Sequence, residues 1–211
     1  MEVFELVSSL IVLILSLAVF AAVHSLMASL PFKRFLMRVI GPSADRLFMP
    51  LFSFIAVITL LPLAYLLYKY PGPFLYIIPS PWRWVMVGGQ LIAAGVAPLA
   101  LLHAPHRFKI RAQLSAPQTL EAGHLDIRGI YQWVRDPFLL SGLVMIWLTP
   151  FMTLNLLIIY LLATIYLYLG SLHWESRLAA QFGNEYREYQ KQVHRIIPGS
   201  KKYHPSTIKK I

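Results

Sequence analysis

The sequence contains no cysteine and very little charge. The absence of cysteine excludes a disulfide scaffold, a thiolate metal site and a cysteine nucleophile. Charged residues make up 13% of the 211 residues, only 9 of them acidic, whereas soluble domains average roughly 25% charged residues. Hydrophobic residues reach 57%. This composition excludes a disordered chain, a coiled coil and an ordinary soluble enzyme, and it directs attention to a membrane.

Long segments without acidic or basic residues separate the few charges. A bilayer core about 30 Å thick is crossed by about 20 apolar residues in a helix. Three uncharged segments each fit one crossing, and a fourth fits two crossings that fold back near Pro150. We therefore predict an all-α integral membrane protein with five transmembrane helices, the last two forming a helical hairpin. The predicted spans are 6–32, 47–68, 84–106, 137–149 and 154–174.

Four prolines between Tyr70 and Trp82 exclude a regular helix there, and we expect this stretch to be a loop lying in the membrane interface. Residues 1–198 are predicted to form a single membrane domain, with cytoplasmic elements at 107–136 and 175–198. The polar and basic tail, 199–211, is expected to be mobile.

The basic residues lie almost entirely on one side of this predicted topology. Of the 19 lysine and arginine residues, only Lys69 and Arg83 fall on the other side. The positive-inside rule then places the N-terminus outside and the C-terminus in the cytoplasm of a bacterial or archaeal inner membrane. The net charge of +10 is explained by contact with membrane lipids, so no nucleic-acid partner is predicted. The oligomeric state is left open.

The segment after the last predicted span has a helical pattern. Leu178, Phe182, Tyr186, Tyr189 and Val193 recur at a spacing that places them on one helix face. Gly183 interrupts the pattern. We predict a cytoplasmic amphipathic helix that packs against the bundle or lies on the membrane.

Two acidic residues mark the inner mouth of the predicted hairpin. Asp136 precedes Pro137, which is a typical N-cap followed by a typical first-turn residue. Glu175 directly follows the last span, and an antiparallel hairpin places it level with Arg135 and Asp136. Histidines near the inner ends of the spans either ligate a metal or haem or are satisfied by water and backbone. No paired spacing stands out among them, so no metal site is predicted.

The sequence from Gly129 to Phe138, GIYQWVRDPF, resembles the Gly-x-Tyr-x-x-Val-Arg-His-Pro segment of isoprenylcysteine carboxyl methyltransferase-like and phospholipid methyltransferase-like membrane enzymes. The segment from Glu175 to Tyr189, ESRLAAQFGNEYREY, resembles the family motif that follows the hairpin, and Arg195-Ile196-Ile197-Pro198 resembles its ending. Near the N-terminus, the stretch from His24 to Ser29 is similar to the NnrU-like and methanethiol S-methyltransferase-like branch.

This resemblance implies S-adenosylmethionine as cofactor, bound at the inner membrane face, and methyl transfer to a lipidic or small apolar acceptor. It assigns no catalytic base. By position it places two residues, His24 and Trp174, on the substrate side. The residues that it implies for the cofactor pocket are His124, Tyr131, Arg135, Asp136, Pro137, Leu139, Glu175, Tyr186 and Tyr189.

Three positions differ from the family pattern, and they keep an alternative open. Asp136 stands where the family has histidine, Leu139 where it has tyrosine, and Trp174 where it has glutamate. These differences favour a non-catalytic or redox-linked NnrU-like membrane protein with an altered or lost cofactor site. A reductase and a carrier are weaker alternatives, because the sequence has neither a dinucleotide fingerprint nor an internal repeat.

Overall fold

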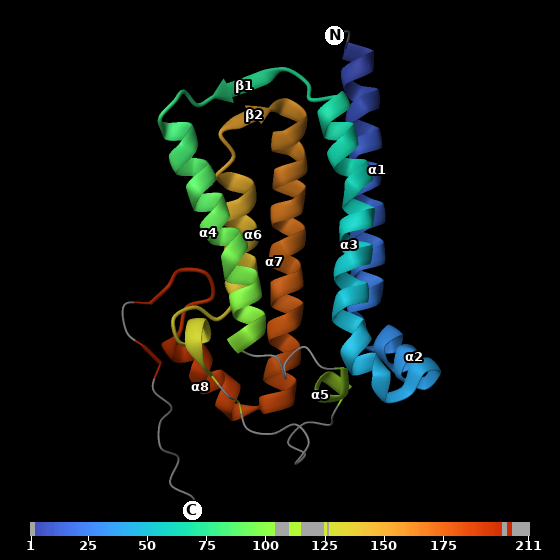
Figure 1. Cartoon of the computed structure of the whole chain (residues 1–211), viewed down its shortest axis with the longest axis vertical. Coiled ribbons are helices and arrows are strands. Elements are labelled where there is room, and N and C mark those ends of the chain that lie inside the picture. The colour runs from blue at the N-terminus through green and yellow to red at the C-terminus, as the bar shows by residue number, and fades with distance from the viewer. Residues whose placement is uncertain (1–2, 104–109, 115–124, 126, 200–201, 204–211) are drawn as a thin grey trace, which may run out of the picture.

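The computed structural model describes residues 3–103, 110–114, 125, 127–199 and 202–203. Most of these residues are helical, and four helices are long and apolar enough to cross a membrane. They run side by side in Figure 1, and the protein is therefore an integral membrane protein. The four helices are α1 (Val3–Ala28), α3 (Ala44–Lys69), α4 (Trp82–His103) and α7 (Leu154–Phe182).

A fifth apolar helix, α6 (Pro137–Trp147), is much shorter than the others. Its 11 residues span only about 16 Å at 1.5 Å per residue. The bundle is built from two pairs, α1 with α3 and α4 with α6, and α7 contacts α1 and α6. Figure 1 shows α7 between the two pairs. Large apolar side chains on α1, α3 and α4 remain exposed, as expected of surfaces that face lipid.

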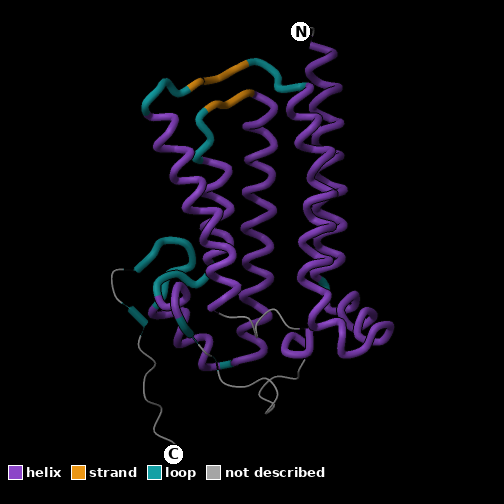
Figure 2. Tube along the Cα trace, in the orientation of Figure 1, coloured by secondary structure: helices purple, strands orange, loops and turns teal. Residues whose placement is uncertain are grey.

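At the end of the bundle near the N-terminus, two short strands form an antiparallel pair, drawn in orange in Figure 2. Strand β1 (Phe74–Ile77) lies in the stretch predicted to be an irregular loop, and β2 (Phe151–Thr153) lies in the turn of the hairpin. The all-α prediction is corrected here. The cause is local, because Phe74–Ile77 is a proline-free apolar run between two prolines, and the hairpin turn supplies the backbone groups with which it pairs.

At the opposite end, the first helix stops earlier than the predicted span 6–32. It ends at Ala28, and α2 (Leu30–Ile40) begins directly after Ser29. The Ser29 hydroxyl accepts a hydrogen bond from the Phe32 amide at 3.3 Å, and Pro31 suits the first turn of the new helix. A 3₁₀ turn, η1 (Gly41–Ser43), then leads into α3.

The last transmembrane helix extends further than the predicted span 154–174. Helix α7 runs through Glu175 to Phe182, so the last span and the first half of the predicted tail helix are one helix. The predicted break at Gly183 is confirmed: this residue has a φ of +56°, which glycine adopts without a steric penalty. Helix α8 (Asn184–Gln192) follows.

The predicted apolar face of the tail is confirmed as a packed core. Its five residues belong to one buried cluster, which also includes Ala100, Ile127 and Tyr131. The tail therefore packs against the bundle through this face.

Two short elements lie at this end of the bundle, α5 (Ile110–Leu114) and η3 (Gly129–Gln132). The predicted span 84–106 ends in the structure at His103, and residues 104–106 lie outside the described part of the chain. After α8 the chain turns back over η3, and we name the described residues 193–199 and 202–203 the C-terminal strap. Backbone amides of Gly199 and Tyr203 donate to the carbonyls of Trp133 and Gln132. The packed structure thus reaches beyond 198, to Tyr203.

Candidate functional site

A buried carboxylate between two arginines forms the centre of the end of the bundle opposite the N-terminus. Glu175 Oε2 accepts a hydrogen bond of 2.6 Å from Arg195 Nη2, and Glu175 Oε1 lies 3.3 Å from Arg135 Nη1. Gln190 Nε2 donates to the same carboxylate at 3.4 Å. Glu175 is only 4% exposed. The expectation that Glu175 lies level with Arg135 is confirmed, and we name Arg135, Glu175, Gln190 and Arg195 the Glu175 cluster.

Backbone hydrogen bonds between the C-terminal strap and the residues that connect η3 to α6 hold the cluster together. The amides of Arg135 and Asp136 donate to the carbonyls of His194 and Arg195, each at 3.0 Å. These two bonds bring both arginines of the cluster to the same carboxylate. The hydrogen bond to Glu175 raises the pKa of the Arg195 guanidinium, so this arginine stays charged.

The glycine of the first motif has a specific steric role. Gly129 has a φ of +54°, and a Cβ at this position would lie 2.3 Å from Nδ1 of His103. His103 accepts a hydrogen bond from the Ile130 amide at 3.2 Å. The glycine therefore lets η3 pack directly against the end of α4, which positions Tyr131.

Asp136, Pro137 and Leu139 start the hairpin helix as the sequence predicted. The Asp136 carboxylate accepts a hydrogen bond of 2.9 Å from the Leu139 amide, and Pro137 is the first helical residue. All three residues are buried. Aspartate at this position, where the related families have histidine, therefore has a structural role as an N-cap.

The three tyrosines that were assigned to the site from the sequence pack together at the same end of the bundle. Tyr131, Tyr186 and Tyr189 are almost completely buried in one cluster, and the hydroxyl of Tyr189 donates to the carbonyl of Tyr131. The ring of Tyr203 from the strap packs edge-on against Tyr189, with ring centroids 5.2 Å apart. The two motifs thus meet in space, although a whole helical hairpin separates them in the chain.

Unused hydrogen-bonding capacity remains in the Glu175 cluster. Within the described part of the chain, three of its buried atoms have no hydrogen-bond partner: Arg135 Nε, Arg195 Nε and Glu175 Oε1. Buried polar atoms without partners are uncommon and call for an explanation, such as a ligand or an ion. Two donors and one acceptor at one place match the carboxylate and ammonium of an amino-acid group.

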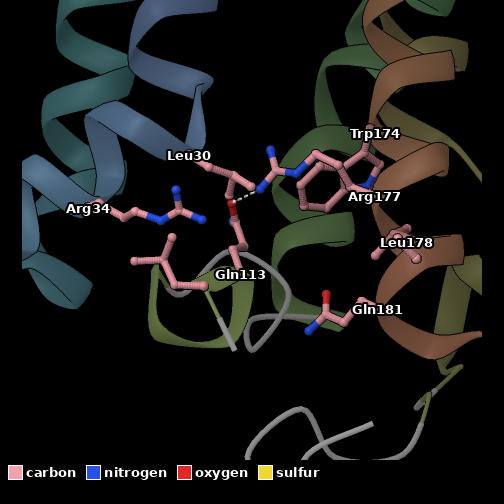
Figure 3. Close-up of a pocket in the computed structure, with 9 residues that line it drawn as sticks. Leu30, Arg34, Gln113, Trp174, Arg177, Leu178 and Gln181 are labelled. Carbon is pink, nitrogen blue, oxygen red and sulfur yellow. Dashed lines mark hydrogen bonds between the residues drawn. The ribbon is translucent and has the colours of Figure 1, made fainter. Parts of the chain in front are cut away.

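A separate cavity of about 240 Å³, lined by both apolar and cationic side chains, lies between α2, α5 and α7. Arg34 from α2 and Arg177 from α7 extend toward one another across it in Figure 3, with Gln113 of α5 between them. Trp174 lines the cavity below Arg177, whose guanidinium carbon lies 5.3 Å from the indole ring centre.

Two predicted site residues lie apart from the Glu175 cluster, and one cannot be placed. His24 packs among the rings of Phe20, Phe52 and Tyr166. Because Tyr166 precedes Glu175 by nine residues on α7, His24 lies roughly 13 Å deeper along the bundle. Trp174 lines the separate cavity. His124 lies outside the described residues, and among the described residues no group of histidine and acidic side chains can hold a metal ion.

The sequence-based site omitted Arg195, Gln190 and the cavity residues other than Trp174. Arg195 belongs to the Arg-x-x-Pro ending, and this motif could have marked it as a site residue. Only the fold shows that the strap brings Arg195 back to Glu175. Gln190 lies in the last turn of α8 and belongs to no motif. The cavity is closed on one side by α2, and no helix over 33–40 was predicted from the sequence.

Sequence comparison finds relatives that cover most of the chain. Methanethiol S-methyltransferase 1 of Bradyrhizobium diazoefficiens is 27% identical over 197 residues, which cover 90% of this chain and 67% of the relative. Methanethiol S-methyltransferase of Mycobacterium tuberculosis is 29% identical over 201 residues, covering 90% and 78%. The enzyme of the same name from a Pseudomonas species is 29% identical over 191 residues, covering 86% and 70%.

No family model matches the chain, and no solved structure matches it. The similarity to methanethiol S-methyltransferases confirms the resemblance that the motifs indicated. It also supports the prediction that the protein is an enzyme of the methyltransferase class.

Proposed function

We propose that the protein transfers a methyl group from S-adenosylmethionine to a small thiol at the inner face of the membrane. The observation that carries the proposal is the Glu175 cluster, in which one buried acceptor atom and two buried donor atoms have no hydrogen-bond partner among the described residues. The names of the relatives point to a sulfur acceptor. A lipidic acceptor, which the wider resemblance also allows, has no such support.

The residues of the cluster fit the amino-acid end of this cofactor. Glu175 Oε1 would accept from the ammonium group, and the two Nε atoms of Arg135 and Arg195 would donate to the carboxylate. Two guanidinium groups share one carboxylate in the cluster, so a ligand carboxylate adds the missing negative charge.

When bound, S-adenosylmethionine supplies an electrophilic methyl group on a sulfonium. The protein itself contributes the orientation of the bound cofactor and the exclusion of water from around it. The buried tyrosines and the strap exclude water from one side of the cluster, and the fixed arginines orient the cofactor. Such a transfer depends mainly on the alignment of acceptor, methyl carbon and leaving sulfur. The sulfur of the acceptor forms the new bond to the methyl carbon, the bond to the sulfonium breaks, and the thiol proton leaves to solvent.

The test is binding of S-adenosylhomocysteine to the detergent-purified protein by calorimetry, combined with a gas-chromatographic assay of methyl transfer to methanethiol. Glu175→Gln removes the charge but keeps a side chain that can accept from Arg195. We expect it to weaken binding by about tenfold or more, since a hydrogen bond to a charged group contributes about 1.5–3 kcal/mol.

Glu188→Gln is the matched control, because Glu188 is an exposed glutamate paired only with Lys191 at 2.7 Å among the described contacts. Its binding constant should equal that of the wild type. Absence of binding by the folded wild-type protein would contradict the proposal and favour the NnrU-like alternative without a cofactor.

A further inference from the structure

The cavity between α2, α5 and α7 is a second site, distinct from the Glu175 cluster. Arg177 follows Glu175 by two residues on α7. Two residues correspond to about 200° around a helix, so the two side chains point to opposite sides of α7. Of the residues predicted for the methyl-transfer site, Trp174 alone is among the described residues that line the cavity.

The cavity has an excess of positive charge. Arg34 and Arg177 line it, and none of the nine described residues that line it is acidic. Lys33 lies beside it and is only 3% exposed. Lys33 Nζ donates to the Ala28 carbonyl at 2.9 Å and to Gln113 Oε1.

The acceptors that serve these cations are few and neutral. Arg177 donates to the same two oxygen atoms as Lys33, at 3.4 Å to Ala28 O and 3.2 Å to Gln113 Oε1. One amide oxygen and one carbonyl are thus shared by two cations. Arg34 makes no hydrogen bond or ion pair within the described part of the chain. Lys33 is buried and Arg177 is half-buried, whereas Arg34 is exposed. Because burying positive charge without a counter-ion is costly, the arrangement suits an anion.

The surroundings of the cavity identify the source of the anion. Helix α2 buries Lys33 and Leu36 but exposes Phe35 and Val39, which are 59% and 63% exposed. Leu26, at the end of α1, is 61% exposed. Apolar side chains exposed next to arginines are typical of a helix lying at the boundary between acyl chains and headgroups.

We propose that this cavity binds the phosphate group of an anionic membrane phospholipid. The phosphate lies between Arg34 and Arg177, where planar guanidinium groups bind two oxygens at once, and the acyl chains extend along the exposed apolar side chains of α1 and α2. The bound lipid joins α2 to α7 at the inner end of the bundle.

The experiment titrates the detergent-purified protein with short-chain phosphatidylglycerol, phosphatidylcholine or inorganic phosphate and counts bound molecules by native mass spectrometry. Phosphatidylglycerol is expected to bind most tightly. Arg34→Gln is the main variant, because Arg34 is exposed and its loss leaves the helix contacts intact. It should weaken binding about tenfold, as should Arg177→Gln.

The matched control is Arg38→Gln, an exposed arginine of the same helix that does not line the cavity. Equal weakening by Arg34→Gln and Arg38→Gln would overturn the proposal, because it would mean diffuse attraction to surface charge. Tight binding of inorganic phosphate with no preference for phosphatidylglycerol would overturn the lipid source. Displacement of the lipid by S-adenosylhomocysteine would also overturn the proposal, since the cavity would then belong to the cofactor site.

Discussion

At the scale of single residues, Gly129 makes the sharpest prediction. A Cβ at position 129 would meet the ring of His103 at 2.3 Å, and the backbone there has a positive φ. Gly129→Ala should therefore destabilise the protein by about 2 kcal/mol, within the range for a strained backbone conformation. It should also weaken S-adenosylhomocysteine binding, because η3 positions Tyr131 and Arg135. Thermal unfolding in detergent and calorimetry measure the two effects.

Gly88→Ala is the control for this substitution. Gly88 lies in α4, and no atom lies within 4 Å of a Cβ built there. Alanine is favoured over glycine in a helix by up to about 1 kcal/mol, so this variant should be as stable as the wild type or more so. Equal melting temperatures for Gly129→Ala and the wild type would show that η3 is not held by this contact.

Predictions about single residues were confirmed where the structure depends only on residues nearby in the chain. An aspartate before a proline predicts the capped start of a helix. Asp136 caps α6 as expected, by accepting a hydrogen bond from the Leu139 amide. The tail's apolar spacing likewise predicted its buried face. Arg195 and the unpartnered atoms of the Glu175 cluster could not be predicted, because they depend on where the strap returns after α8.

At the scale of elements, α2 depends on its cap. The Ser29 hydroxyl donates to the Leu26 carbonyl at 2.6 Å and accepts from the Phe32 amide. Ser29→Ala should destabilise the start of α2 by about 1 kcal/mol. Hydrogen exchange should accelerate in peptides covering 30–36 and remain unchanged in α3.

Ser43→Ala is the matched control, because Ser43 precedes α3 in the same way but its side chain makes no capping hydrogen bond. It should leave exchange in both helices unchanged. If Ser29→Ala also leaves exchange in α2 unchanged, packing of Leu36 and Lys33 rather than the cap holds the helix.

The elements that the sequence predicted least well are those with weak local signals. Long uncharged segments predicted the long helices, because crossing a membrane requires length and apolarity. The same prediction placed residues 30–32 in the first span and left the rest of α2 outside any predicted helix, since it followed charge and ignored the serine and proline at 29 and 31. The strand pair was not predicted, because β1 and β2 are far apart in the chain and each is too short to have a pattern of its own.

At the scale of the whole molecule, the direction of insertion is the remaining prediction. The described ends of the chain lie at opposite ends of the bundle in Figure 1. If α6 and the turn at β2 complete a crossing, the protein crosses the membrane five times, with the N-terminus outside and the C-terminus in the cytoplasm. The distribution of basic residues supports this orientation.

Because the chain has no cysteine, single cysteines report the topology without background. Phe4→Cys and Phe74→Cys replace exposed side chains near the N-terminus and in β1, and both should react with an impermeant maleimide in intact bacterial cells. Arg38→Cys and Lys191→Cys replace exposed residues at the other end, and they should react only after the cells are lysed. Reaction of Phe4→Cys and Lys191→Cys from the same side would mean an even number of crossings. In that case the 11-residue α6 would not complete a passage, and the Glu175 cluster would lie on the same side of the membrane as the N-terminus.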